Sequence, residues 1–464
     1  MQSNIQNRRS FIKSAGLVSL GFLGLTQYVN GKSFLTPAAN NAGYGALLAD
    51  PQGILNLPKG FSYKVIFRQG DKMTDGFFGP DYPDGMATFK GKNDRVILIR
   101  NHETNPGHEN GPYGKNLELL GKLKPEQVYD YGEGKQPGTG GTSTLIFNEK
   151  TGEVETSYLS LAGTVRNCAG GMTPWRSWIS CEENTSRAGE GLEKDHGYNF
   201  EVPASEKINL ADPLPLKEMG RFNHEAVCVD PRTSIVYQTE DRGDGLIYRF
   251  LPNKKEKLHK GGTLQVLAIK GQKSFDTRNW KDLETPKMPK NEKMEVEWLD
   301  IDNVEAPEDD LRLRGFESGA ARFARGEGMW FGDDELYFAC TNGGEIGSGQ
   351  VFRYVPSTYE GTEREKEAPG TVELFLEPND QDILKNCDNL TIAPWGDIIL
   401  CEDHPEPFVV GVTQQGEIYK LAENVGYRTE FAGGVFSPSG DTYFVNIQGA
   451  GITLAITGPW KKPA

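Results

Sequence analysis

The sequence predicts an all-β fold, a six-bladed β-propeller with inserted loops. Six short apolar, strand-like segments each end in a cluster rich in acids and amides, which is the repeat expected of propeller blades. The 56 glycines and 27 prolines among 464 residues, with 10% aromatic residues, are typical of many short strands joined by turns. In a propeller, such strand ends converge on one axial opening, where oxygen-bearing side chains from distant segments can bind a hard cation together. The clusters lie at residues 100–103, 180–184, 239–242, 340–343, 401–404 and 445–448.

The N-terminal residues have the layout of an export signal. Arg8 and Arg9 precede an apolar stretch at residues 15–25, which is typical of a twin-arginine signal. The stretch is shorter than the roughly 20 apolar residues that a membrane-spanning helix needs, so we expect no stable membrane insertion. We therefore expect a signal peptide at residues 1–31, recognised by the twin-arginine export machinery, and a single propeller domain at residues 32–464. The protein is expected to be exported, and so periplasmic or secreted.

The predicted strands follow one another as hairpins separated by polar loops. Residues 141–147 and 154–161 form one hairpin signal, and residues 226–229 and 235–238 form another. Residues 104–140 and 253–311 are polar and irregular, which indicates long inserted loops, and only residues 381–385 show any helical periodicity. Further strands are expected at 94–103, 246–250, 329–340, 351–355, 390–401, 418–421, 435–446 and 453–456.

Charge and missing motifs narrow the function classes. The formal net charge of −15 argues against nucleic acid as a partner, and it reflects either plain solubility or charge that bound cations neutralise. The sequence has no G-x-S-x-G nucleophile elbow, no phosphate-binding loop of the G-x-x-x-x-G-K-[ST] type and no H-E-x-x-H zinc helix. Hard-cation chemistry based on carboxylates therefore remains the best physical option.

The six cysteines do not resemble a disulfide framework. Four of them lie inside apolar strand patterns, where a thiol behaves as a small buried hydrophobe, and Cys387 fits either environment. Cys168 differs because it lies in a glycine-containing segment, N-C-A-G-G at 167–171, that lets the backbone approach a ligand closely. Its thiolate could bind a transition metal, or the thiol could be incidental to a turn; spacing alone leaves both open.

Two segments place an arginine beside a glutamate just ahead of a strand. Arg221 precedes Glu225, and Arg325 precedes Glu327. Such pairs are usually structural salt bridges. At a propeller axis, however, the carboxylates would hold cations, and a guanidinium would bind an oxyanion such as phosphate through paired N–H bonds.

These motifs together resemble the PhoX-type alkaline phosphatases. The resemblance is carried by N-C-A-G-G-M-T-P-W at 167–175 followed by C-E-E-N at 181–184, and it continues at 220–226, 239–242, 325–328, 388–390, 402–403 and 447–448. It spans residues 84–460 and includes the twin-arginine start. The chain is shorter than the longer family members and carries Arg166 directly before Asn167, which puts the substrate range in question more than the metal binding.

The resemblance implies a monomeric six-bladed propeller whose axial site holds ferric iron (Fe3+) and calcium (Ca2+) and hydrolyses small phosphate monoesters. Residue by residue, it implies a thiolate iron ligand in Cys168 and a phosphate-binding group in Arg325. Glu225 and Glu327 would bridge or ligate iron and calcium, and Asp388 would serve calcium. The further ligands that it implies are Glu103 and Glu402.

Elementary chemistry supports the same activity. Cations clustered around one oxygen depress its pKa, giving a metal-bound oxo or hydroxo nucleophile that can attack phosphorus, while Arg325 neutralises the equatorial oxygens. Two alternatives remain open from the sequence. A calcium-dependent, lactonase-like hydrolase would need neither Cys168 nor Arg325, and a non-catalytic binding propeller would use the axial acids only as strand-end residues.

Overall fold

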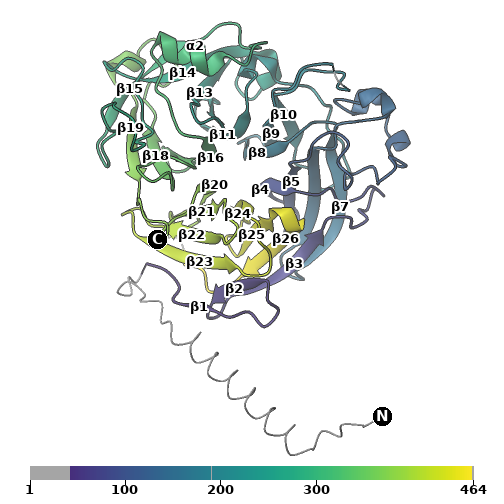
Figure 1. Cartoon of the computed structure of the whole chain (residues 1–464). Coiled ribbons are helices and arrows are strands. Elements are labelled where there is room, and N and C mark those ends of the chain that lie inside the picture. Colours follow the sequence, from purple (N-terminus) through teal and green to yellow (C-terminus); the bar gives the residue numbers. More distant parts are fainter. Residues whose placement is uncertain (1–41, 190, 462–464) are drawn as a thin grey trace, which may run out of the picture. The chain divides into compact units, whose positions relative to one another are not determined.

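Six short strands surround the centre of the fold in the computed structural model, which describes residues 42–189 and 191–461. Each of them contacts the next in a closed ring, and the last, β24, contacts the first, β4. Figure 1 shows all six around the centre. They are β4 (Pro83–Lys90), β8 (Asn167–Met172), β11 (His224–Val229), β16 (Gly326–Phe331), β20 (Cys387–Ile392) and β24 (Phe431–Phe436).

Antiparallel sheets extend outward from these inner strands, and consecutive strands pair as hairpins. The first sheet has four strands and the second has three. The first sheet continues from β4 through β5 (Arg95–His102), β6 (Gly141–Asn148) and β7 (Glu153–Ala162). The second continues from β8 through β9 (Ser177–Glu182) and β10 (Asn199–Pro203).

A nine-stranded sheet contains two of the inner strands, β11 and β16. Its outer strand β15 pairs with β14 at five positions but with β19 only at Met294↔Val372 and Glu295↔Thr371. Two four-stranded units are therefore joined at their outer edges through β15. The remaining strands are β12 (Val236–Glu240), β13 (Ile247–Pro252), β14 (Gly262–Ile269), β15 (Met294–Asp300), β17 (Leu336–Cys340), β18 (Gln350–Val355) and β19 (Thr371–Leu376).

The last two sheets combine strands from both ends of the described chain. In one, β3 pairs with β26 from Ile452↔Arg68 to Thr457↔Ser62. In the other, β2 pairs with β23 through Leu55↔Asn424. The strands not yet named are β1 (Leu47–Leu48), β2 (Leu55–Pro58), β3 (Ser62–Arg68), β21 (Ile398–Glu402), β22 (Phe408–Val412), β23 (Ile418–Asn424), β25 (Thr442–Ile447) and β26 (Ile452–Thr457).

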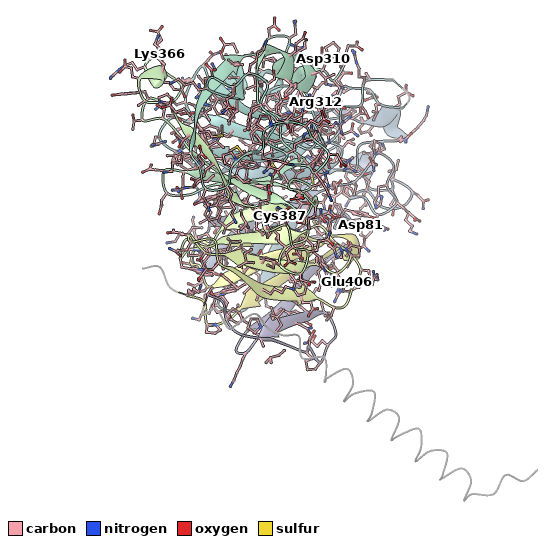
Figure 2. All side chains as sticks on the ribbon, turned by 60° about the vertical axis from the view of Figure 1, so that its left-hand side comes forward. Asp81, Asp310, Arg312, Lys366, Cys387 and Glu406 are labelled. Carbon is pink, nitrogen blue, oxygen red and sulfur yellow. The ribbon has the colours of Figure 1, made fainter. Side chains whose placement is uncertain are left out.

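Between residues 42 and 461, leaving out residue 190, helical structure is confined to short segments. The described chain has one α-helix, α2 (Leu311–Ser318), and none of its helices is long and apolar enough to cross a membrane. Single turns of 3-10 helix occupy η1 (Leu120–Lys122), η2 (Pro125–Gln127), η3 (Gly132–Gly134), η4 (Lys217–Met219), η5 (Leu258–Lys260), η6 (Glu365–Glu367) and η7 (Gln448–Ala450). Figure 2 shows Lys366 of η6 at the outer edge of the fold, whereas Cys387, labelled near the middle of the view, is buried.

The all-β, propeller-like arrangement predicted from the sequence is confirmed, but several details are corrected. The described strands form five hydrogen-bonded sheets rather than six separate ones, because β15 joins two units. Residues 253–311, expected to be a loop, contain β14 and β15, and the helical segment expected at 381–385 is a turn. The predicted signal segment lies outside the described residues. All six cysteines are free thiols, as expected.

A buried charged triad fixes the loop that follows β9. The fully buried His196 contacts Glu182 through Nδ1 at 2.7 Å and Asp130 through Nε2 at 3.2 Å. Burial disfavours the imidazolium, but the two carboxylates outweigh it and raise the pKa of His196 to about 9. The charged form of His196 therefore stabilises the fold.

We expect His196 to make stability depend on pH. Because the pKa is about 9 in the folded chain and 6.5 in the unfolded one, the contribution is fully present below pH 6.5 and is lost as the pH rises through 9. The difference in unfolding free energy between the wild type and His196→Gln should thus shrink by about 3 kcal/mol over this range. Urea denaturation at several pH values measures it, with the exposed His259→Gln as control. A difference that does not change with pH would contradict the assignment.

Candidate metal centre

An interruption of strand pairing brings side chains to the centre. In each sheet, the pairing of the inner strand with its neighbour skips two residues at the end nearest the preceding loop, for example between Pro83 and Met86. Such a bulge releases a residue from the strand alternation and redirects its side chain. The first released residue is an acid or a thiol in five strands and a glycine in the sixth: Asp84, Cys168, Glu225, Glu327, Asp388 and Gly433.

The second released residue is small in most strands because neighbouring inner strands lie very close together. A Cβ atom on Gly85 would lie 2.6 Å from the Cα of Ala169, and one on Gly328 would lie 2.4 Å from the backbone nitrogen of Leu390. Neither distance is compatible with a side chain. The pattern of a functional residue followed by a small one thus places the ligand and also closes the ring.

A second set of side chains comes from the residue directly after the second strand in five of the six units. Glu103 follows β5, Glu183 follows β9 and Asp403 follows β21. Asp241 follows β12, and Gln448, after β25, donates to Asp84 Oδ2 at 2.6 Å and to Glu103 Oε2 at 2.8 Å. The inner-strand bulges and these strand ends therefore face the same space.

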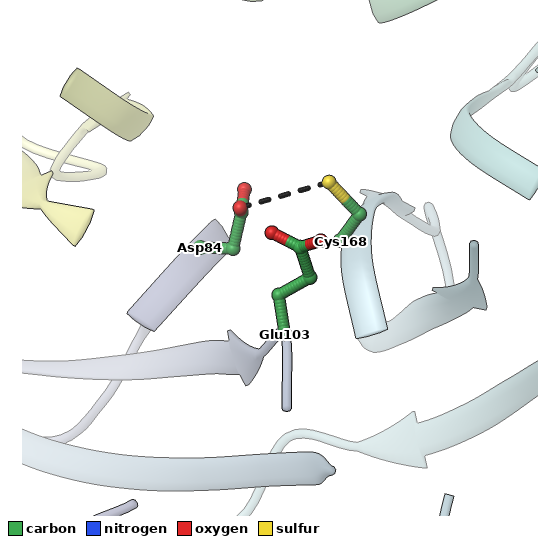
Figure 3. A group of neighbouring side chains, drawn as sticks. All are labelled: Asp84, Glu103 and Cys168. Carbon is green, nitrogen blue, oxygen red and sulfur yellow. Dashed lines mark hydrogen bonds between the residues drawn. The ribbon is translucent and has the colours of Figure 1, made fainter. Parts of the chain in front are cut away.

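Together these side chains form four overlapping groups that could hold metal ions. In each group the ligand atoms lie within 4.8 Å of one another. Figure 3 shows the first group, in which the Cys168 sulfur lies 3.6 Å from Asp84 Oδ2 and Glu103 approaches from the end of β5. The groups are Asp84, Glu103 and Cys168; Cys168, Glu183 and Glu225; Glu225, Glu327 and Asp388; and Asp388, Asp403 and Glu430.

The electrostatics of these groups fit cations. Neither oxygen of the fully buried Glu225 has a hydrogen-bond partner among the described residues, and nor does Asp84 Oδ1. Burial and neighbouring acids raise the pKa of Glu225 and Glu327 well above the usual range and that of Asp388 to about 8. Gathering buried, unpaired carboxylates is costly unless positive charge compensates them. The donor set therefore fits metal ions.

The donor atoms differ along the cluster. Cys168 supplies sulfur to two groups, and burial together with Asp84 and Glu225 raises its pKa well above that of a free thiol. A thiolate among carboxylates suits a transition metal, which would itself favour deprotonation of the thiol. The group of Asp388, Asp403 and Glu430 offers only oxygen, which suits calcium.

Arg325 lies within reach of this cluster and is partly exposed. Its Nε and Nη2 atoms donate to both oxygens of Asp241 at 2.8 and 3.0 Å, and Nη2 also donates to Glu327 Oε1 at 2.7 Å. Nη1 lies 3.7 Å from Asp403 Oδ2, which is too long for a hydrogen bond. One edge of the guanidinium is thus held in place, while Nη1 remains able to donate to a ligand.

Arg166 forms a second positive charge at the cluster. Its Nη2 atom lies 2.5 Å from both Glu103 Oε1 and Glu183 Oε2. Arg166 and Arg325 each precede an inner strand, and their φ angles are +48° and +51°. Residues other than glycine rarely adopt this left-handed backbone, and such strain is concentrated at functional sites.

The structure brings Cys168, Glu225, Glu327, Asp388 and Glu103 together, with Arg325 bonded to Glu327. It does not bring Glu402 to them. Within the described residues Glu402 belongs to none of the four groups, because its oxygens accept backbone N–H bonds from Lys385 and Phe408, each at 2.8 Å.

Strand alternation explains the position of Glu402. It is the last residue of β21, and the last residues of β9 and β12, Glu182 and Glu240, likewise accept backbone N–H bonds from nearby loops. The next residue faces the opposite way and reaches the centre. Sequence reasoning therefore missed Glu183 and Asp403, although both lie in segments that carry the family resemblance, 181–184 and 402–403. It also missed Asp84, which begins the segment similar to the family, and Glu430, which lies outside every motif.

The fold resembles that of a solved structure. A structure of Pseudomonas fluorescens PhoX in complex with vanadate, a transition state analogue, has a TM-score of 0.63 and 17% identity, covering 88% of this chain and 96% of that one. At this identity the likeness shows the fold. A Xanthomonas campestris gluconolactonase has a TM-score of 0.39 and 12% identity, covering 87% of this chain and 97% of that one. A luciferin-regenerating enzyme has a TM-score of 0.43 and 8% identity, covering 87% of this chain and 98% of that one.

The sequence matches no curated protein. It does match a family model, that of the alkaline phosphatase PhoX, over residues 42–451, which is most of the chain. The chain therefore belongs to the PhoX alkaline phosphatase family.

Proposed function

We propose that the protein hydrolyses phosphate monoesters at a metal centre that holds iron and calcium. The observation that carries the proposal is the buried cluster of carboxylates and one thiol, with unpartnered Glu225 oxygens, beside a partly exposed Arg325. Family membership supports the reaction class, because the family consists of alkaline phosphatases. Bound iron and calcium ions would lower the pKa of water and neutralise negative charge on the phosphate.

The ligand roles follow from the donor atoms and from which groups share a residue. Cys168 and Glu225 share a group and would hold iron through sulfur and oxygen. Glu225 also shares a group with Glu327 and Asp388, so it would bridge neighbouring ions. Asp388 would complete an all-oxygen calcium site, and Glu103 would be a ligand together with Cys168 and Asp84, with which it shares a group.

Arg325 would bind the phosphate. Asp241 fixes its guanidinium, so that little conformational freedom is lost when the substrate binds. Glu327, Asp241 and Asp388 raise its pKa against the effect of burial, so the guanidinium stays charged at every pH relevant to the enzyme. A fixed positive charge that donates to the equatorial phosphoryl oxygens stabilises the transition state. A calcium-only lactonase would leave both Arg325 and Cys168 without a role.

The architecture and localisation form part of the same proposal. The closed ring of six inner strands supports counting six blades, two of them joined in the nine-stranded sheet. We propose that residues 1–31 are a twin-arginine signal, that residues 32–464 form one propeller domain and that the monomer works after export.

Removal of the metal ions should abolish activity. After chelator treatment, hydrolysis of a chromogenic phosphate monoester is expected to fall to background and to return only when iron and calcium are both added. The reason is that the sulfur-containing and all-oxygen groups prefer different ions. Full activity in protein shown to contain neither metal would overturn the proposed mechanism.

Glu225→Gln and Glu402→Gln form a matched pair of buried substitutions. Glu225→Gln should reduce bound iron and calcium by more than about tenfold, because it removes a ligand charge shared by two groups. Glu402→Gln should leave the metal content unchanged but lower the unfolding free energy by about 1–3 kcal/mol, because it disturbs backbone bonds. Elemental analysis and urea denaturation measure both effects. Equal metal loss in the two variants would contradict the ligand assignment.

Substitution of Arg325 tests phosphate binding. Arg325→Lys keeps the charge but removes the planar donor pair, so kcat/KM for a chromogenic monoester should fall by about 10²- to 10³-fold. Arg314→Lys is the control, because Arg314, on α2, forms comparable pairs with Asp310 and Asp302. If both substitutions reduced kcat/KM equally, Arg325 would have no special role.

A further inference from the structure

A polar hollow of about 380 Å³ lies beside the metal ligands. All seven residues that line it are polar, and two are arginines. They come from the segments before β8 and β11 and after β9 and β12. They are Arg166, Glu183, Asn184, Thr185, Ser186, Asn223 and Arg242.

The hollow is continuous with the metal centre. Glu183 lines it and also belongs to the group with Cys168 and Glu225. Arg166 lines it as well and contacts both Glu103 and Glu183. A molecule whose phosphate reached the metal ligands could therefore extend into this space.

The rim of the hollow is held in a fixed position. The buried Arg221 donates to the backbone oxygens of Thr185 and Ser186, and through Nη1 to Ala306 O at 3.1 Å. Asn223 donates to Glu183 Oε1 at 2.8 Å and to the carbonyl of Asp241 at 3.2 Å. The lining is thus organised before any ligand arrives, which lowers the entropic cost of binding.

The two arginines of the hollow differ in how fully they are neutralised. Arg166 lies between two carboxylates at 2.5 Å. Arg242 has a looser ion pair, with its Nη2 atom 3.5 Å from Asp309 Oδ2, and Asp309 is itself shared with Arg312. About a third of the Arg242 side chain is exposed. Arg242 therefore retains donors for an anion.

Arg242 is tied directly to the proposed phosphate-binding residue. The backbone N–H of Arg325 donates to the carbonyl of Arg242 at 2.9 Å, and Asp241, next to Arg242 in the chain, pairs with the Arg325 side chain. Two guanidinium groups anchored on neighbouring backbone can contact the two ends of one small molecule.

We propose that the hollow is a second anion subsite, in which Arg242 binds a carboxylate or a second phosphate on the alcohol part of the substrate. This inference rests on the proposed phosphatase function. The substrate class is then small phosphate monoesters whose alcohol carries another anionic group. The polar lining suits such an alcohol better than one that carries an apolar ring.

Matched substrates test the subsite. 3-Phosphoglycerate and glycerol 3-phosphate differ by a carboxylate in place of a hydroxymethyl group, and 1,3-propanediol bisphosphate carries a second phosphate. With metal-loaded wild-type enzyme, kcat/KM should be about tenfold higher for the esters with a second anion, equivalent to about 1.4 kcal/mol. Whichever of the two anionic esters shows the higher value identifies the preferred second group. Equal values for all three esters would overturn the proposal.

Two variants test whether Arg242 causes the preference for esters with a second anion. Arg242→Gln should reduce the ratio of kcat/KM between 3-phosphoglycerate and glycerol 3-phosphate to about one. Arg364→Gln should keep the wild-type ratio, because Arg364 pairs with Glu367 next to Lys366 at the outer edge (Figure 2). Thermal unfolding confirms that each variant is folded. A ratio unchanged in Arg242→Gln would contradict the assignment.

A binding measurement separates this inference from the proposed reaction. Calorimetry should show 3-phosphonopropionate binding the metal-loaded protein about tenfold more tightly than propylphosphonate, and Arg242→Gln should remove the difference. If no ester is hydrolysed, the proposed function fails and this pair of ligands still decides whether the subsite exists. Equal affinity of the wild type for the two phosphonates would overturn the subsite, even in an active phosphatase.

Discussion

The interruption of pairing at the start of each inner strand is the constraint on which the rest of the structure depends. It releases one side chain per strand toward the centre, and the small residue that usually follows lets neighbouring strands approach closely. Without the small residue the ring could not close. Without the interrupted pairing the acids would follow the alternation of the strand, and their side chains would face the neighbouring sheets and not the centre. The same local geometry therefore builds both the fold and the candidate metal centre.

The repeated geometry concentrates negative charge that the protein only partly compensates. Arg166 and Arg325 each contact two or three carboxylates of the cluster, yet the oxygens of Glu225 stay without a partner among the described residues. The buried triad at His196 shows how the chain handles charge elsewhere, since there a cation is placed between two carboxylates. At the centre no such cation faces Glu225 among the described residues, which favours bound ions as the charges that compensate these carboxylates.

Much of this could be predicted from sequence because strand-end chemistry is local. Cys168, Glu225, Glu327 and Asp388 each lie just inside a strand, in short motifs that resemble the family, and this resemblance is what pointed to them. The sequence does not show which of two adjacent acids reaches the centre, because that depends on which face of the strand its last residue occupies. Glu402 and Asp403 differ in this respect alone. The joining of two units through β15 depends on contacts between residues about 75 apart, which no local pattern encodes.

The pairing of β3 with β26 has a consequence for biosynthesis. β3 (Ser62–Arg68) is made early in translation but finds its neighbour only when β26 (Ile452–Thr457) has been made, so the sheet that contains β24 stays incomplete until then. Glu430 lies directly before β24 of that sheet and belongs to the group with Asp388 and Asp403, so this group is completed late in synthesis. A chain terminated before Glu430 would then leave the ribosome with this group one acid short.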